Sequence, residues 1–138
     1  MTAIDARTRT EIEVVEAFLG ALADLDVDAA LALCHPDVTY QNVPLPPARG
    51  KAATEKQLRF LSRCSGFQAI NHNIAANGEV VLTERTDVIE IGRFKPSFWV
   101  CGSFRVRDGL IVSWKDYFDY ADVTVSVVKA AVRALRRR

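Results

Sequence analysis

The sequence predicts an α+β fold in which helices cover one face of a strongly curved, antiparallel or mixed sheet that forms a cone. Apart from one short strand, apolar residues up to about residue 61 recur at helical spacing, whereas from residue 67 they alternate as in strands. Asn77-Gly78 and Asp108-Gly109 are typical of tight hairpin turns, which join antiparallel strands. Because 138 residues, 49% of them hydrophobic, suffice for a core, we expect residues 1–138 to form a single domain.

Three helices are expected in the first part of the chain. Thr10-Glu11-Ile12-Glu13 matches a capping box, so the first helix is expected to begin at this motif. Asp26 or Asp28 can cap the second helix, and His35 is expected to end it because it precedes a proline. The expected helices run from Thr10 to about Ala23, from Ala29 to Cys34 and from about Ala52 to Leu61.

Five strands and a final helix are expected to complete the domain. The segment from Pro44 to Pro47 can continue neither a helix nor a central strand, so it ends the first strand. The expected strands are Val38–Asn42, Phe67–Ile74, Val80–Ile91, Phe98–Arg107 and Leu110–Asp119. The final helix is expected from Val123 to Leu135, with Val125, Val128, Val132 and Leu135 as its apolar side. Strong bending of such a meander would create an interior pocket.

Composition excludes several classes of function. A net charge of +1 gives no overall attraction to nucleic acid or anionic lipid, although Arg136 to Arg138 make the end of the chain basic. No apolar run approaches the roughly 20 residues that span a bilayer, and Met1 to Arg9 lacks the apolar core of a signal peptide. Cys34, Cys64 and Cys101 are odd in number and widely separated, which favours a reducing compartment. We therefore expect a cytoplasmic protein with no nucleic-acid partner and no membrane span.

Arg85 and Asp87 form a charged pair on a strand face that is otherwise apolar. Because side chains alternate along a strand, the pair shares its face with Val81 and Ile89. Burying such a pair costs several kcal/mol unless further polar groups complete the site. The pair therefore points to a polar site inside the predicted cone.

Asp116 is a second candidate for this site, because it lies in another apolar row. One face of its strand is expected to carry Leu110, Val112, Trp114, Asp116 and Phe118, and the other Ile111, Ser113, Lys115 and Tyr117. If the strands pair in sequence, Asp116 faces the same cavity as Arg85 and Asp87. Burial and crowding would raise the pKa of one carboxylate, while the arginine would keep the other ionised. Such a pair provides a general acid and a general base at neutral pH.

An acid that protonates a leaving oxygen and a base that deprotonates water are what one-step hydrolysis of a strained ether requires. Tyr40 and Asn42 share a face of the first strand and could hold the water. Neither Ser113 nor Cys101 has a histidine at a position that suggests a nucleophile, and two histidines alone do not make a metal site. Spacing alone leaves a second interpretation open, in which Arg85 and Asp87 form a buried ion pair in a protein without catalytic activity.

Three blocks of the sequence resemble limonene-1,2-epoxide hydrolase and its bacterial relatives. They are Tyr40-Gln41-Asn42-Val43-Pro44-Leu45-Pro46-Pro47, Glu84-Arg85-Thr86-Asp87-Val88 and Trp114-Lys115-Asp116-Tyr117-Phe118-Asp119, in the order of that family. The resemblance covers most of the chain and implies the cone-shaped fold of nuclear transport factor 2 and ketosteroid isomerase, usually as a homodimer. Lys115 stands where the family typically has arginine, but it lies on the strand face opposite to Asp116.

The resemblance also implies a role for each matching residue. Asp116 would be the base that activates water, and Asp87 the acid that protonates the epoxide oxygen. Arg85 would bridge the two carboxylates, while Tyr40 and Asn42 would help Asp116 to hold the water. In that family the reaction is a single displacement without a covalent ester intermediate and without a cofactor.

The expected function is therefore hydrolysis of a small apolar epoxide, terpenoid, sterol or fatty, to a vicinal diol. The residues expected to line its binding site, by strand face and motif position, are Leu19, Leu22, Ile89, Phe98, Val100, Trp114 and Phe118. Because a fold does not fix a function, two alternatives remain open. One is an isomerase, cyclase or dehydratase of the same fold, and the other is a module that binds a lipid-like ligand without chemistry.

Overall fold

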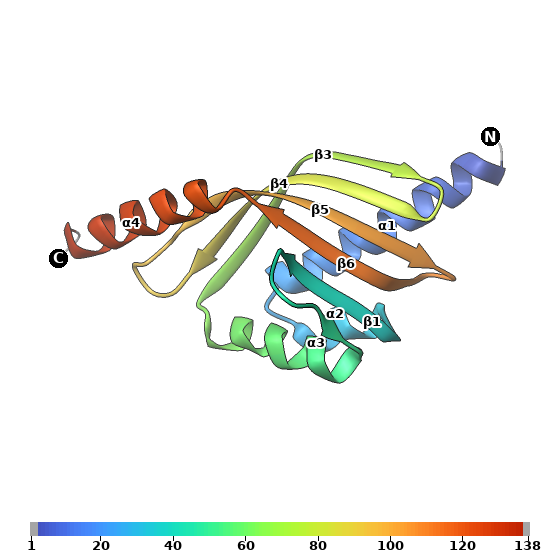
Figure 1. Ribbon diagram of the computed structural model, residues 1–138, viewed down its shortest axis with the longest axis horizontal. Helices are drawn as coiled ribbons and strands as arrows, with labels where there is room; N and C mark the ends of the chain where they lie inside the picture. The colour runs from blue at the N-terminus through green and yellow to red at the C-terminus, as the bar shows by residue number, and fades with distance from the viewer. Residues whose placement is uncertain (1–2, 137–138) are drawn as a thin grey trace.

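The computed structural model describes residues 3–136, which form an α+β fold around one six-stranded sheet (Figure 1). The strands are β1 (Cys34–Val43), β2 (Ala48–Arg49), β3 (Gly66–Asn77), β4 (Val80–Glu90), β5 (Ser97–Arg107) and β6 (Leu110–Phe118). The helices are α1 (Ala3–Ala23), α2 (Val27–Ala32), α3 (Lys51–Leu58), the 3-10 helix η1 (Arg59–Arg63) and α4 (Tyr120–Arg136). Within residues 3–136, no helix is long and apolar enough to cross a membrane. The predicted fold class is confirmed.

The sheet is mixed, with the strand order β2-β1-β6-β5-β4-β3. The strands from β3 to β6 form the predicted antiparallel meander, and β1 adds to it in parallel beside β6. In Figure 1, α1 runs behind the strands, α3 lies below β1, and α4 projects from the end of the sheet. The two ends of the described chain lie at opposite ends of the long axis. The N-terminal helices cover the inner face of the sheet.

The core lies between α1 and the inner face of the sheet. Val15, Phe18 and Leu22 of α1 are at most 2% exposed, which matches their predicted helical spacing. The ring of Phe18 contacts Trp114 edge-on, with ring centroids 4.9 Å apart, and Phe104 at 6.2 Å. These aromatic contacts hold α1 against β5 and β6, the strands that carry one side of the candidate site.

Several helix boundaries differ from the predicted ones. α1 begins at Ala3, so Thr10 to Glu13 lie inside the helix and are not its capping box. Asp26 caps α2 as expected, since its Oδ1 accepts a hydrogen bond from the backbone of Ala29 at 3.0 Å. Cys34, however, does not end α2 but begins β1, because it pairs with Ile111 of β6.

An irregularity in β6 changes which residues of this strand face the core. Arg105 pairs with Ser113 and Val106 with Ile111, so Val112 is an extra residue without a partner on β5. Such a β-bulge shifts the alternation of side chains by one residue. Ile111 is therefore fully buried, like Trp114 three residues later, and the prediction that Ile111 faces outward is wrong. From Trp114 to Phe118 the predicted alternation is correct.

The final helix has apolar residues on two sides. Its expected apolar side is exposed: 51% for Val125, 57% for Val128, 44% for Val132 and 68% for Leu135. At 100° per residue, Val123, Val127 and Ala130 lie on the opposite side of the helix. Ala130 is only 4% exposed, so this second side, which the sequence does not single out, faces the body of the protein.

Candidate active site

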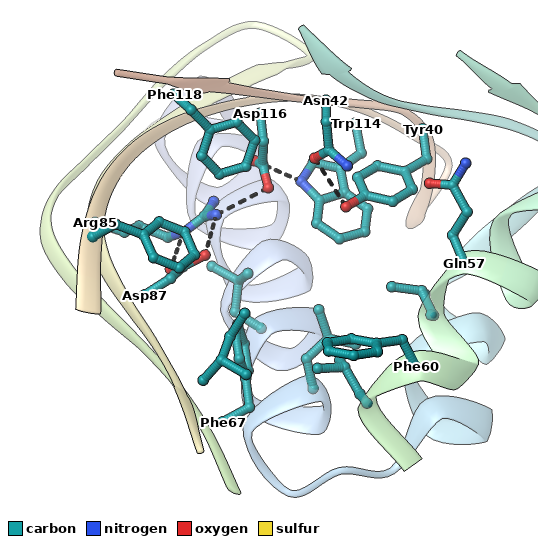
Figure 2. A pocket seen from close by; sticks show the side chains of 16 residues that line it. Tyr40, Asn42, Gln57, Phe60, Phe67, Arg85, Asp87, Trp114, Asp116 and Phe118 are labelled. Atoms are coloured by element: carbon teal, nitrogen blue, oxygen red, sulfur yellow. Dashed lines mark hydrogen bonds and ion pairs between the residues drawn. The ribbon is translucent and has the colours of Figure 1, made fainter. Parts of the chain in front are cut away.

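A pocket of about 200 Å³ lies between the inner face of the sheet, α1, α3 and η1 (Figure 2). Its walls are apolar and consist of Leu19, Leu22, Leu58, Phe60, Leu61, Phe67, Ile89, Phe98, Trp114 and Phe118. Its polar residues are Tyr40, Asn42, Gln57, Arg85, Asp87 and Asp116. The five predicted catalytic residues are therefore brought together in one pocket, although they come from β1, β4 and β6.

Arg85 is the charged centre of this pocket and is 1% exposed. Its Nε and Nη2 donate to Oδ1 and Oδ2 of Asp87, both at 3.0 Å. The same Nη2 donates to Oδ2 of Asp116 at 3.2 Å. Asp87 and Asp116 are only 5% and 3% exposed. One buried guanidinium thus bridges two buried carboxylates from β4 and β6, even though β5 runs between these strands.

Gly102 of β5 makes this bridge sterically possible. In the sheet register it pairs with Thr83 of β4 and with Asp116 of β6. A Cβ atom at Gly102 would lie 2.5 Å from Nη1 of Arg85 and 2.7 Å from Oγ1 of Thr83. Thr83 Oγ1 also accepts a hydrogen bond from Nη1 of Arg85 at 3.1 Å. The guanidinium of Arg85 therefore crosses β5 at Gly102, where no side chain blocks it. Thr83 holds its remaining nitrogen, Nη1.

Asp116 has a second donor besides Arg85. Nε1 of Trp114 donates to Asp116 Oδ1 at 2.8 Å. Both residues point inward from β6 because they are two positions apart, after the bulge. Trp114 thus lines the pocket as predicted. It also holds in place the carboxylate that the family resemblance assigns as the base, and no sequence pattern predicts this hydrogen bond.

Tyr40 and Asn42 stand beside Trp114 and Asp116 on the neighbouring strand. In the parallel register of β1 and β6, Tyr40 pairs with Trp114 and Asn42 pairs with Asp116. The Tyr40 ring stacks on Trp114 at a centroid distance of 3.9 Å, and its hydroxyl donates to Asn42 Oδ1 at 3.0 Å. Because Asn42 Oδ1 accepts the Tyr40 hydroxyl, the amide group of Asn42 is held in one orientation beside Asp116 (Figure 2).

Burial and charge shift the protonation equilibria of three of these groups. Burial raises the pKa of Asp116, and the negative charge of Asp87 adds to this, against the opposing effect of Arg85. Burial disfavours the charged form of Arg85, but the two carboxylates outweigh it, so its pKa lies above the ordinary value. Burial, followed by the charge of Asp116, raises the pKa of Tyr40, which is therefore a neutral donor.

Six of the seven predicted wall residues line the pocket: Leu19, Leu22, Ile89, Phe98, Trp114 and Phe118. The prediction is wrong for Val100. This residue is fully buried and does not line the pocket, because Arg85 of β4 and Phe118 of β6 flank it in the register and present the larger side chains.

Three further lining residues come from the segment between β1 and β4 and are not marked by any sequence pattern. Phe67 comes from β3, and Gln57 and Phe60 come from α3 and η1. In Figure 2 the side chain of Gln57 extends toward Tyr40. Leu58 and Leu61, beside them in sequence, are buried, but no motif marks Gln57 or Phe60 as pocket residues. Thr83 and Gly102 were missed as well, because their roles depend on the register across β5.

The chain resembles known proteins over most of its length. A model of the limonene-1,2-epoxide hydrolase (LEH) catalytic domain matches residues 9–133. Epoxide hydrolase EphG of Mycobacterium tuberculosis (strain ATCC 25618 / H37Rv) is 43% identical over 118 residues, which cover 86% of this chain and 79% of EphG. A solved LEH-like epoxide hydrolase of M. tuberculosis superposes with a TM-score of 0.87 at 41% identity, covering 93% of this chain and 96% of that one.

More distant structures share the fold alone. A putative polyketide cyclase of Xanthomonas campestris pv. campestris superposes with a TM-score of 0.78 at 22% identity, covering 88% of this chain and 98% of that one. The family is decided by the match over residues 9–133 and by the relative at 43% identity. The chain therefore belongs to the limonene-1,2-epoxide hydrolase family, as its three sequence blocks predict.

Proposed function

We propose that this protein adds water to an apolar epoxide to give a vicinal diol, in one general acid/base step without a cofactor. The observation that carries the proposal is the pair of buried carboxylates, Asp87 and Asp116, bridged by Arg85 inside a largely apolar pocket. Membership of the limonene-1,2-epoxide hydrolase family supports the reaction type. The apolar walls support an apolar substrate, because the polar lining residues other than Gln57 gather around the two carboxylates.

Asp116 is proposed as the base that takes a proton from water. Its raised pKa makes it a stronger base than an ordinary carboxylate. Trp114 and Arg85 each donate to one of its oxygens and hold it in place. The neighbouring amide of Asn42, oriented by the Tyr40 hydroxyl, supplies a further polar group for the water.

Asp87 is proposed as the acid that protonates the epoxide oxygen as the ring opens. Arg85 donates to both oxygens of Asp87, and this pair of hydrogen bonds fixes the orientation of the carboxyl group in the pocket. In the proposed step an O–H bond of water breaks, a C–O bond forms, and the C–O bond of the ring breaks. The proton from water goes to Asp116, and the proton on the new hydroxyl comes from Asp87. Return of a proton from Asp116 to Asp87 completes the cycle.

Replacement of either carboxylate by its amide tests these roles. We expect Asp116→Asn and Asp87→Asn each to lower turnover by about 10²- to 10⁴-fold, because an amide cannot transfer the proton. Both variants keep nearly the same shape, so thermal unfolding should show a folded protein. Asp108→Asn is the matched control, since this residue lies in the β5–β6 turn at φ 53°, which asparagine tolerates.

Hydrolysis in ¹⁸O-labelled water separates the proposed function from its alternatives. Epoxide hydrolysis places one solvent oxygen in each product molecule. An isomerase, cyclase or dehydratase would give a product without it, and a ligand-binding module would give no product. Near-normal diol formation by both amide variants would disprove the assigned roles while leaving the reaction itself intact.

We further propose that the protein is a cytoplasmic homodimer that acts in detoxification or lipid metabolism. The exposed valines of α4 support a dimer, because they leave apolar surface for a second copy to cover. Cys34, Cys64 and Cys101 are free, which supports a reducing compartment. Apolar epoxides arise from lipids and terpenes and react with nucleophiles, so their removal is the proposed role.

A further inference from the structure

Gln57 stands apart from the other polar residues of the candidate active site. Those residues come from strands β1, β4 and β6, whereas Gln57 comes from the last turn of α3. Its neighbours on the same wall of the pocket, Leu58, Phe60 and Leu61, are apolar. In Figure 2, Gln57 lies on the side of the pocket away from Asp87. The pocket therefore has a second polar point, separate from the two carboxylates.

The side-chain amide of Gln57 is free to bind a ligand. Within residues 3–136 it makes no hydrogen bond, and the side chain is exposed. Arg59, two residues later, is engaged instead: its Nη2 donates to Asp28 at 2.7 Å and to Glu55 at 2.9 Å. A glutamine amide carries two donor hydrogens and one acceptor oxygen. Gln57 can therefore hydrogen-bond an oxygen atom of a ligand without losing a contact inside the protein.

The small size of the pocket brings a bound ligand close to α3. Its volume is about 200 Å³, below the roughly 300–1,000 Å³ that is typical of ligand pockets. A substituted cyclohexene oxide with its epoxide at Asp87 and Asp116 therefore extends to the wall that α3 and η1 form. The substituent remote from the epoxide then lies beside Gln57.

An amide at this position distinguishes ligands by the atom that covers it. An apolar group over the Gln57 amide excludes water from it and leaves a donor unpaired, whereas an oxygen atom replaces the lost hydrogen bond. Because the side chain of Gln57 is exposed, water still reaches part of the amide, which limits the difference. The net contribution of one hydrogen bond corresponds to about a three- to tenfold preference.

We propose that Gln57 is a specificity-determining residue whose Nε2 donates to a carbonyl or hydroxyl oxygen of the substrate, at the end remote from the epoxide. This inference rests on the proposed hydrolysis and adds a second oxygen to the substrate class. The epoxide lies between Asp87 and Asp116, the apolar ring fills the pocket, and the second oxygen lies at Gln57. Gln57 takes no part in the proton transfers, so it affects which epoxide is bound and not the chemical step.

Two epoxides that differ in one atom test this role. They are limonene 1,2-epoxide and the same epoxide with an acetyl group in place of the isopropenyl group, which exchanges =CH₂ for =O. Gln57→Leu should lower the ratio of kcat/KM for the acetyl epoxide to kcat/KM for limonene 1,2-epoxide by about three- to tenfold, through KM, because leucine has no donor. Gln57→Glu should lower this ratio by at least as much, since an ionised glutamate keeps the size and polarity but also lacks a donor.

Gln68→Leu is the matched control for Gln57→Leu. Gln68 is exposed and follows Phe67, which lines the pocket, so it lies on the outer face of β3. This variant removes the same amide and should keep the parent ratio. The inference is overturned if Gln57→Leu and Gln68→Leu give the same ratio, or if Gln57→Leu lowers kcat/KM equally for both epoxides. It is also overturned if Gln57→Glu keeps the parent ratio, since the donor would then not be needed.

A binding measurement keeps this test independent of the proposed chemistry. Limonene and 4-acetyl-1-methylcyclohexene carry the same two substituents without an epoxide, so neither can be hydrolysed. Calorimetry should show that Gln57→Leu, relative to Gln68→Leu, weakens binding of the ketone more than binding of limonene, by the same factor. If neither epoxide is hydrolysed but this difference in Kd is seen, the proposed function fails and the role of Gln57 stands. If diols form but this difference is absent, the function stands and the role of Gln57 fails.

Discussion

Asp87 and Asp116 are held differently by the same arginine. Asp87 receives two hydrogen bonds from Arg85, whereas Asp116 receives one from Arg85 and one from the indole of Trp114. The Trp114 hydrogen bond favours the ionised form of Asp116 and so opposes the effect of burial on its pKa. Trp114 is therefore more than a wall of the pocket, because it keeps the proposed base oriented and ionised.

Trp114→Phe isolates this contribution. The phenyl ring keeps much of the packing against Tyr40 and Phe18 but cannot donate a hydrogen bond to Asp116. Loss of the donor raises the pKa of Asp116 further, so a larger fraction of the base is protonated at a given pH. The acidic limb of the kcat/KM profile should move to higher pH, and kcat at neutral pH should fall roughly tenfold.

The other tryptophan provides the control for this variant. Trp99 lies on the outer face of the sheet, where its Nε1 donates to Glu84 at 3.1 Å. Trp99→Phe removes the same chemical group and should leave the pH profile unchanged. An unshifted profile in Trp114→Phe would mean that this residue serves packing alone.

Gly102→Ala tests whether the bridge depends on the gap in β5. The added Cβ would lie 2.5 Å from Nη1 of Arg85, so the guanidinium has to move away from Asp116 or from Thr83. A displacement of about 1 Å in a catalytic group can cost about 100-fold in rate. We expect a loss of kcat of that order, together with a destabilisation of about 1–3 kcal/mol in thermal unfolding.

Gly20→Ala is the matched control for Gly102→Ala. A Cβ at Gly20 meets nothing within 4 Å, and alanine favours a helix interior by about 0.5–1 kcal/mol. This variant should unfold at a higher temperature and keep its activity. If Gly102→Ala is as active as Gly20→Ala, the guanidinium does not need the gap.

At the level of the elements, strand alternation made most of the site predictable. Arg85 and Asp87 share the inner face of β4, and Asp116 follows Trp114 by two residues on β6, so a period of two was enough to bring them to one side. The parallel pairing of β1 with β6 was not predictable, because parallel partners lie far apart in sequence and no turn joins them. It is this pairing that places Asn42 beside Asp116.

Irregular positions account for the predictions that failed. No residue type typical of a β-bulge marks the bulge at Val112 in the sequence, yet this bulge turns the side chain of Ile111 into the core. η1 brings Phe60 to the pocket because α3 tightens into a 3-10 turn after Leu58, which helical periodicity does not reveal. Val100 was misassigned for a related reason: its inward face was correct, but the larger side chains on both neighbouring strands cover it.

At the level of the whole molecule, the residues 3–136 leave two apolar areas uncovered. One is the side of α4 formed by Val125, Val128, Val132 and Leu135, and the other is the outer face of the sheet, where Leu82, Trp99 and Tyr117 are 54%, 42% and 44% exposed. Apolar surface of this extent is typical of an interface. A second copy of the chain is the proposed partner, because two-fold homodimers bring the same surface together from both subunits.

Val128→Lys tests the proposed dimer. A lysine in the middle of the apolar side of α4 would be buried without a partner, which costs several kcal/mol, so the dissociation constant should rise by about 100-fold or more. Ala17→Lys, at an exposed position of α1, adds the same charge elsewhere and should leave the dimer intact. Sedimentation equilibrium at micromolar concentrations measures both variants against the parent. A parent that is monomeric there, or a Val128→Lys variant that dimerises as tightly as Ala17→Lys, would contradict the proposal.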